Sequence, residues 1–252
     1  MFKSWDKDKY LAAFFVHLAP KILPMLKLLR IKTVSFCLFF VGLGILQAQE
    51  GLVSFKMKIT GEMADLMGPM MPNKMTVRYK DGNSRISMEG GMAASMMGDI
   101  VYLSEKNEAY MLRDKEKTAY KMPDKQPGEN VKPEVTLLGE EEMNGYKCRK
   151  YKIVIKGEKD GSVDQIMWAT DDIKMPKPKK SAAVGSGSSL FLDEIEGFPV
   201  KVELSMQQMG INLNQIIELD KYDPAPQDPA LFRIPENFKI KDFDPKMFGG
   251  GR

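Results

Sequence analysis

The chain has 252 residues, of which 43% are hydrophobic, and a formal net charge of +3. Residues 1–49 hold seven of the 37 Lys and Arg residues and two of the 34 Asp and Glu residues. The remainder therefore carries a formal charge of −2, so no general attraction to nucleic acid follows from the charge, and we expect no nucleic-acid partner. The only histidine, His17, and one of the two cysteines, Cys37, also lie in residues 1–49. The remainder can therefore hold no histidine-based catalytic site, no imidazole metal site and no internal disulfide.

Residues 1–49 have the pattern of a leader. Basic residues precede an apolar run over residues 34–46, and Ala48 offers a small residue for signal peptidase. The run is shorter than the roughly 20 apolar residues of a membrane span, so we interpret it as a secretory signal. A retained N-terminal anchor is the alternative. The stretch before Met25 fits no signal-peptide pattern, which makes Met25 a candidate for the true start.

The next part of the chain predicts short antiparallel strands. From Val53 to Ile59, apolar residues alternate with polar ones, which is typical of a strand with one dry face and one wet face. Asp81-Gly82-Asn83 predicts a hairpin turn, because Gly and Asn accept the positive φ of a tight turn. Further strands are expected at residues 75–80, 84–89, 100–104 and 108–113, with an edge strand at residues 118–122.

Two Met-rich segments, residues 62–72 and 90–98, interrupt this pattern. Met63 and Met67, and likewise Met92 and Met96, are four positions apart, so a short helix would place each pair on one stripe. Glycines and prolines bound both segments, so we expect two hinged flaps over the dry side of the sheet. Three interpretations stay open: the methionines fill an ordinary core, enclose a pocket for an apolar ligand, or hold Cu(I). The Cu(I) cluster would consist of Met67, Met70, Met71 and Met75.

The second half repeats the strand pattern. Strands are expected at residues 135–138, 146–155 and 163–170, with a tight turn at Asn144-Gly145. The apolar parity changes between Cys148 and Tyr151, which predicts a β-bulge near Arg149-Lys150.

Residues 198–206 give the clearest strand of the chain, and residues 211–219 give its return. Five alternate apolar side chains would share one dry face, worth roughly 7–15 kcal/mol on burial. These are Phe198, Val200, Val202, Leu204 and Met206. A short strand near Phe238 would follow. The turns between strands are short, which favours antiparallel pairing throughout, with about ten strands in all.

The segment between these strands, residues 171–189, is rich in Pro, Lys, Gly and Ser, so we expect a protruding, mobile loop. Its lysines either form a solvated loop or contact anionic headgroups at a membrane surface. They are Lys174, Lys177, Lys179 and Lys180. Cys148 is interpreted as a buried hydrophobe, with a reactive thiol as the alternative, and Trp168 as core or as a wall of a ligand cavity.

No carboxylate pair, phosphate-binding loop, nucleophile elbow or zinc spacing is found, so the sequence indicates no enzyme, cofactor or metal site.

Four short motifs resemble the secreted domain-of-unknown-function family 4412 of Bacteroidota-type bacteria. They lie at residues 144–151, 166–170, 197–201 and 232–236, and the similarity extends from about Gly51 onward. The resemblance implies export and a β-rich fold, and it implies no catalytic residues. The architecture also looks like the LolA-type envelope lipoprotein carriers, in which helices lie across the concave face of an unclosed antiparallel barrel.

Together these features predict a mainly β protein, with residues 50–252 as one antiparallel domain: a curved sheet or half-barrel with short Met-rich helical flaps. We expect a non-enzymatic protein of the periplasm or outer envelope that binds a lipid or acyl chain in an apolar cavity. The alternative is a structural or interaction protein with a filled core. The candidate lining residues are Phe55, Met57, Met63, Met67, Met92, Met96, Trp168, Val202 and Leu204.

Overall fold

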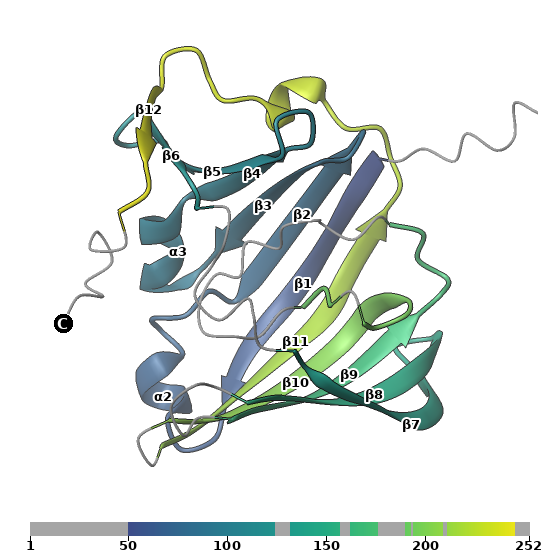
Figure 1. Cartoon of the computed structure of the whole chain (residues 1–252). Coiled ribbons are helices and arrows are strands. Elements are labelled where there is room, and N and C mark those ends of the chain that lie inside the picture. The colour runs from purple at the N-terminus through teal and green to yellow at the C-terminus, as the bar shows by residue number, and fades with distance from the viewer. Residues whose placement is uncertain are drawn as a thin grey trace, which may run out of the picture. The chain divides into compact units, whose positions relative to one another are not determined.

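The computed structural model describes residues 50–123, 132–156, 162–175, 190–192, 194–208 and 211–244, which hold twelve strands in one sheet and a few short helices (Figure 1). The expected signal sequence and Met25 lie outside these residues. The strands of the first half are β1 (Glu50–Thr60), β2 (Lys74–Lys80), β3 (Asn83–Glu89), β4 (Asp99–Leu103), β5 (Glu108–Arg113) and β6 (Thr118–Lys121). Those of the second half are β7 (Glu134–Met143), β8 (Tyr146–Lys156), β9 (Ser162–Thr170), β10 (Phe198–Gln208), β11 (Ile211–Asp223) and β12 (Lys239–Asp242). The helices are α2 (Ala64–Met67), α3 (Gly91–Met97) and the 3-10 helix η1 (Pro229–Phe232).

The sheet consists of two antiparallel meanders joined side by side. Its strand order is β12-β6-β5-β4-β3-β2-β1-β11-β10-β9-β8-β7, so β1 to β6 form one run and β7 to β11 the other. The two runs meet where β1 pairs with β11. Figure 1 shows an open, curved sheet, as the sequence predicted.

Two predicted turns determine the register of their hairpins. Asp81 and Gly82 have φ values of 50° and 79°, and Asn144 and Gly145 have 54° and 81°. Positive φ at both central residues is the type I′ geometry that matches the twist of the flanking strands. The first turn joins β2 to β3 and the second joins β7 to β8.

One face of the sheet, which we call the inner face, carries the main core. Its side chains come from β1 to β6 and from β8 to β11. They include Val53, Val77, Ile153 and Met167, each at most 1% exposed. The opposite, outer face holds two smaller clusters.

The last strand corrects two expectations. β12 pairs with β6 in parallel, with Lys239 opposite Thr118, so the sheet is not antiparallel throughout and β6 is not an edge strand. A parallel pair cannot be joined by a tight turn, and here the whole second meander separates β6 from β12 in the sequence. Residues 224–238 connect β11 to β12. This connection covers the outer face of β4 to β6, where Ile234 and Phe238 pack against the cluster around Val101.

A β-bulge lies one strand away from its predicted position. The register of β7 against β8 shifts between Leu137 and Gly139, which face Tyr151 and Lys150. Across the same part of β8, pairing with β9 is continuous. The change in apolar parity along β8 therefore arises because the strand is buried on both faces. Cys148 packs on the outer face and Tyr151 on the inner face.

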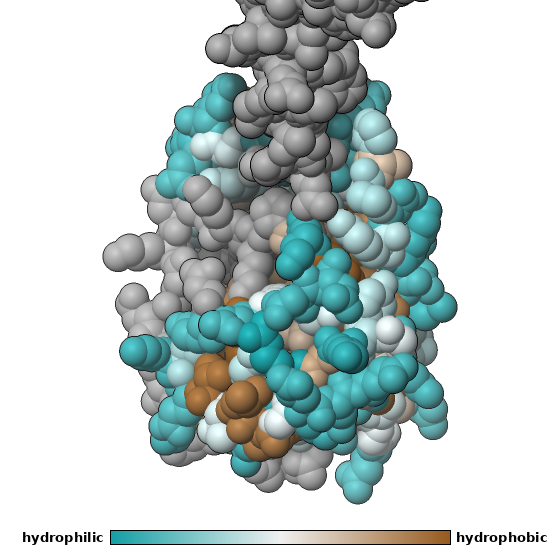
Figure 2. Space-filling view, turned by 90° about the vertical axis from the view of Figure 1, so that its right-hand side faces the viewer, coloured by the Kyte–Doolittle hydropathy of each residue, from teal (hydrophilic) through white to brown (hydrophobic). Residues whose placement is uncertain are grey.

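The surface seen from the right-hand side of Figure 1 is mostly hydrophilic, with hydrophobic residues gathered low on the molecule (Figure 2). The edge strand β7 lies on this side and carries two exposed leucines, Leu137 and Leu138, at its bulge.

Candidate functional site

The centre of the inner face is a group of three aromatic rings. Phe55 on β1 and Phe198 at the start of β10 have ring centroids 6.1 Å apart and are stacked. Phe191, from the connection between β9 and β10, lies 6.4 Å from Phe55 and 5.6 Å from Phe198. Phe55 is fully buried and Phe191 is 8% exposed. Two strands, β1 and β10, and the connection before β10 therefore meet at one apolar centre.

The described ends of the β9–β10 connection fold over this centre, and we call residues 171–175, 190–192 and 194–197 the cover. Ile173, Met175 and Ile195 belong to the inner-face core, and each is at most 7% exposed. The protruding loop expected over residues 171–189 is wrong for the described part of it, residues 171–175, because Ile173 and Met175 are buried. Apolar side chains spaced among the polar ones of this connection bury themselves against the sheet, because that removes them from water. Residues 176–189 lie outside the described part of the chain.

Arg149 of β8 holds both ends of the cover. Its guanidinium forms an ion pair of 2.6 Å with Asp171 at the beginning of the connection. It also contacts Glu196, two residues before β10 begins. A planar guanidinium presents several donors, so one side chain can bind two carboxylates.

Three predicted lining residues share the inner-face core, and a fourth packs against it. Phe55, Val202 and Leu204 are at most 3% exposed, and Met57 is partly buried. Register explains this grouping, because Val202 is opposite Met167 of β9 on one side and Ile217 of β11 on the other.

Trp168 is a correction, because the structure places it on the outer face. It packs with Cys148 and Val200, in a cluster separate from that of Phe55. Strand alternation is the reason: Met167 and Ala169 point inward, so Trp168 between them points outward. It therefore does not line the inner face.

The expected position of Val200 is also wrong. In the pairing of β10 with β9, Pro199 is opposite Ala169 and Lys201 is opposite Trp168, so Val200 is an extra residue. A β-bulge of this kind turns a side chain to the other face of the sheet. Val200 is fully buried against Trp168 rather than beside Val202.

Charges surround the ring of Trp168. The ammonium groups of Lys150 and Lys201 lie 4.8 and 5.2 Å from the ring centroid, and the indole Nε1 donates a hydrogen bond to Glu141. This hydrogen bond, followed by one from Lys150 at 3.1 Å, lowers the pKa of Glu141. Lys150, Lys201 and Glu141 therefore form a charged layer over the small apolar cluster of the outer face.

The neighbouring thiol of Cys148 is suited to packing. It is 2% exposed, and burial raises its pKa to about 11. A thiol with such a pKa carries almost no thiolate near neutral pH, and the thiolate is the reactive form.

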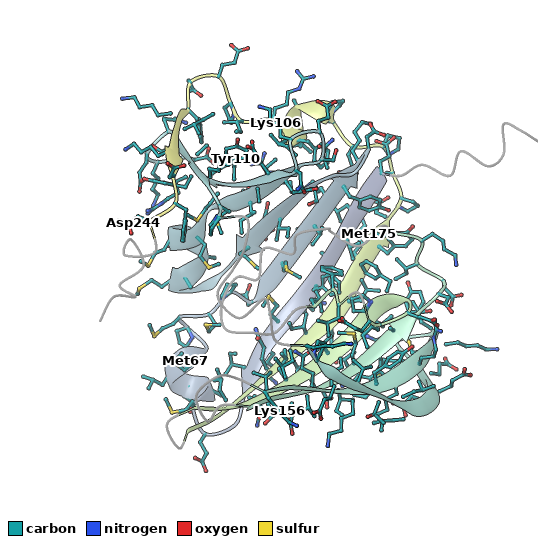
Figure 3. All side chains as sticks on the ribbon, in the orientation of Figure 1. Met67, Lys106, Tyr110, Lys156, Met175 and Asp244 are labelled. Atoms are coloured by element: carbon teal, nitrogen blue, oxygen red, sulfur yellow. The ribbon has the colours of Figure 1, made fainter. Side chains whose placement is uncertain are left out.

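The two Met-rich segments form the predicted short helices, α2 and α3, but they do not lie over the inner face. Both stand at the end of the sheet where β1 and β3 finish, opposite the turn that holds Lys106 (Figure 3). Neither helix buries a residue, and the inner-face core includes no methionine of α2 or α3. Two backbone hydrogen bonds join the segments, from Met92 to Pro69 (3.3 Å) and from Ala93 to Met70 (2.9 Å).

The predicted flap residues therefore occupy a rim. Met63 and Met67 are partly exposed, and Met92 and Met96 are 62% and 45% exposed. The four proposed Cu(I) ligands differ in environment, because Met75 is in the inner-face core while Met70 is 45% exposed. Within the described ranges, no group of three or more His, Cys, Asp or Glu side chains could hold a metal ion.

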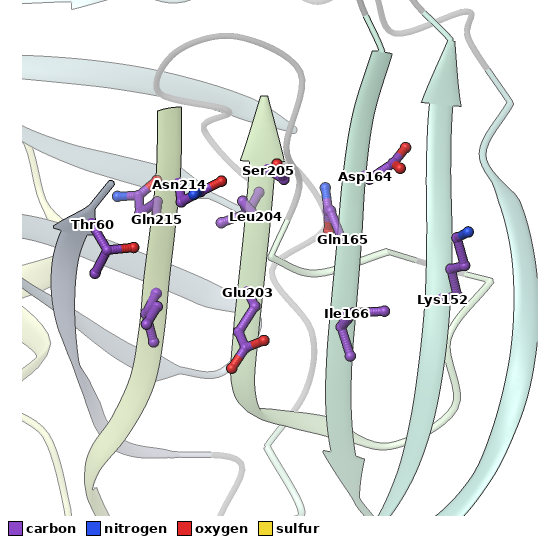
Figure 4. A pocket seen from close by; sticks show the side chains of 11 residues that line it. Thr60, Lys152, Asp164, Gln165, Ile166, Glu203, Leu204, Ser205, Asn214 and Gln215 are labelled. Carbon is purple, nitrogen blue, oxygen red and sulfur yellow. The ribbon is translucent and has the colours of Figure 1, made fainter. Parts of the chain in front are cut away.

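A pocket with a volume of about 520 Å³ lies across β8 to β11 and the end of β1 (Figure 4). By strand alternation, most of its lining side chains belong to the outer face. Of the predicted residues it includes only Leu204. The lining residues are Thr60, Lys152, Asp164, Gln165, Ile166, Glu203, Leu204, Ser205, Asn214, Gln215 and Ile216. This mixed polar pocket is not the apolar cavity that the sequence predicted.

Sequence reasoning missed one residue, Gln165 on β9. It is 1% exposed and shares the inner face with Met167. In the part of the chain that the structure describes, neither its Nε2 nor its Oε1 has a hydrogen-bond partner. The only signal in the sequence was a polar residue at an inward position of an alternating strand.

Of the four lysines proposed for membrane contact, Lys174 is exposed and the other three lie outside the described residues: Lys177, Lys179 and Lys180. Among the residues searched, no helix is both long enough and apolar enough to cross a membrane.

Several solved structures are distantly similar to this chain. LprF from Mycobacterium bovis has 12% identity and a TM-score of 0.33, covering 75% of this chain and 90% of its own. A LolA superfamily protein from Nitrosomonas europaea has 8% identity and a TM-score of 0.32, with coverages of 74% and 94%. The lipoprotein LppX from Mycobacterium tuberculosis has 9% identity and a TM-score of 0.31, with coverages of 70% and 88%.

The comparison with curated proteins finds no match to this chain. A family model described as "Domain of unknown function (DUF4412)" matches residues 55–238. That match covers most of the sequence, including the aromatic centre and the cover, so the chain belongs to domain-of-unknown-function family 4412.

Proposed function

We propose that this protein is a non-enzymatic, exported protein of the periplasm or outer envelope that holds a hydrophobic molecule, a lipid or acyl chain, against the inner face. One observation carries the proposal. The apolar inner face continues across the sheet from β6 to β8, while in the described residues an irregular connection, rather than a second layer of strands or helices, packs on it. Each CH₂ group of a guest that replaces water there would gain about 0.8 kcal/mol.

The cover is the element that would move to admit a guest. It has no strand or helix of its own in the described residues. Its ends are held by Arg149 through side-chain ion pairs, which can break without unfolding the sheet.

The Met-rich rim would be the entrance. Leu66, Met70, Met92 and Met96 are each at least 45% exposed, on two segments that are hydrogen-bonded to one another. Flexible thioether side chains adapt to apolar guests of different shapes. The proposed guest-contacting residues are accordingly those of the inner face and the rim: Phe55, Met57, Met63, Met67, Met92, Met96, Val202 and Leu204.

Export and membrane contact complete the proposal. Residues 1–49 would be removed as a leader, and the lysines after β9 would contact anionic headgroups when a guest is exchanged. N-terminal sequencing of the protein from its native envelope would test the first point, since a retained leader would contradict export by cleavage.

A second candidate is a structural or interaction protein with a filled core. The seating of Phe191 against Phe55 and Phe198 favours it, because the ring already occupies space that a guest would need.

The deciding experiment is native mass spectrometry of the protein purified from its own envelope, with binding of the neutral dye N-phenyl-1-naphthylamine as a second readout. We expect a co-purified lipid and saturable dye binding. Met57→Gln should weaken dye binding, because Met57 packs against the inner face. Lys58→Gln, the adjacent residue on the outer face, should not. Protein that is empty and binds no dye would support the filled core.

A further inference from the structure

Gln165 occupies an apolar position on the inner face. On β8 its cross-strand neighbour is Ile153, and on β10 it is Leu204. Along β9 its neighbours on the same face are Val163 and Met167. Ile153 is fully buried, and Leu204 and Met167 are 3% and 1% exposed. Strand pairing therefore gives Gln165 apolar neighbours on the inner face, while the residue also borders the pocket across β8 to β11.

This amide has unused hydrogen-bonding capacity. Its Nε2 can donate two hydrogen bonds and its Oε1 can accept two, yet both atoms lack a partner among the described residues. Leaving a buried amide unpaired is costly, and native proteins pair the great majority of such groups. An apolar residue at this position would avoid the cost, so the amide calls for a partner beyond the described residues, and a bound guest is one that could supply it.

The surroundings restrict what that partner can be. The side chains that flank Gln165 on the inner face, Ile153, Val163, Met167 and Leu204, carry no charge. The ionisable neighbour Asp164 points to the outer face. A charged headgroup buried here would lose its hydration without a counter-charge, whereas the desolvation of a neutral polar group could be offset by hydrogen bonds to the amide.

We infer that Gln165 anchors the guest by hydrogen-bonding an uncharged carboxamide or ester group adjoining its hydrocarbon chain. This inference rests on the proposed function and narrows its ligand class from hydrophobic molecules in general to neutral acyl amides and esters. A carboxamide is the best match, because it accepts from Nε2 and donates to Oε1 at once.

The test is competition for bound N-phenyl-1-naphthylamine by two probes of equal chain length, decanamide and 1-bromodecane, using the full chain. In the unaltered protein both probes displace the dye. In Gln165→Met, which keeps the length and volume of the side chain, the Kd for decanamide should rise roughly tenfold, the effect of one or two neutral hydrogen bonds. The Kd for 1-bromodecane should stay within about twofold, since it depends on apolar contact alone.

Gln215→Met is the matched control. Gln215 lies on the same face, opposite Leu204 on the far side from Gln165, and is 7% exposed. It should leave the ratio of the two Kd values unchanged.

Three results would overturn the inference: an unchanged Kd for decanamide in Gln165→Met, an equal loss for both probes, or the same selective loss in Gln215→Met. If neither probe displaces the dye from the unaltered protein, the proposed function itself fails and the anchor with it. The urea midpoint of Gln165→Met without probes should not fall, which separates loss of binding from loss of folding.

Discussion

Replacing Phe191 with alanine tests whether the cover packs on the aromatic centre. Truncating a buried phenylalanine costs about 3–5 kcal/mol, which includes the lost burial and the cavity left behind. The ring contacts with Phe55 and Phe198, at 6.4 and 5.6 Å, contribute about 0.5–1.5 kcal/mol each beyond burial. Phe191 retains 8% exposure and lies on an irregular segment that can relax, so we expect a loss near the lower end, about 3 kcal/mol.

Urea unfolding monitored by circular dichroism would measure this loss. Domains have about 5–15 kcal/mol of stability, so Phe191→Ala should remain folded, with a lower midpoint and an unchanged m-value. Leu190→Ala, at a partly buried neighbouring position, should cost under about 2 kcal/mol. A loss below about 1 kcal/mol for Phe191→Ala would show that the ring does not cover the core, and the account of the cover would be wrong.

Three further predictions concern other parts of the sheet. Cys148 should react with a thiol reagent at about pH 8 only after denaturant is added, because burial raises its pKa to about 11; rapid labelling of the native protein would contradict the buried outer cluster. Hydrogen bonds lower the pKa values of Glu50 and Glu141 in the folded protein from the usual 4.5. The ionised carboxylates therefore stabilise the fold fully above about pH 4.5, and this stability is lost as the pH falls through the folded pKa values. The urea midpoint should therefore be lower at about pH 3 than at about pH 6, and an unchanged midpoint would refute this. Gly98→Ala should lower the thermal midpoint, because Gly98 has a φ of 69° and a Cβ there would meet the Leu112 carbonyl oxygen at 2.1 Å; the strained backbone alone costs roughly 1–2 kcal/mol, and an unchanged midpoint would contradict the position of α3.

The sequence predicted most of the strands because their signals are local. The turns at Asp81-Gly82 and Asn144-Gly145 need only the conformational preferences of two adjacent residues. Period-2 alternation placed Phe55, Val202 and Leu204 on one buried face, and i, i+4 spacing predicted helices α2 and α3.

The errors concern features that depend on which strands become neighbours. Val200 follows the alternation of its own strand, and only its pairing with β9 reveals the bulge that turns it outward. Trp168 lies in a strand that is buried on both faces, so hydrophobicity alone could not determine its direction. The parallel strand β12 is joined to β6 by long-range pairing that no turn encodes. The burial of Phe191 depends on a connection whose composition resembles that of a solvated loop.

The joint between the two meanders has a consequence for how the chain folds. Strand β1 pairs with β2 nearby and with β11, whose residue Asn214 faces Thr60. Each meander can form from local hairpins as soon as its own residues are available. The pairing of β1 with β11 requires both meanders and closes a long loop. Until β11 arrives, one side of β1 presents unpaired backbone donors and acceptors to any passing strand. A newly made chain would thus be most vulnerable to mispairing at its earliest strand, which gives folding catalysts or chaperones a specific edge to shield.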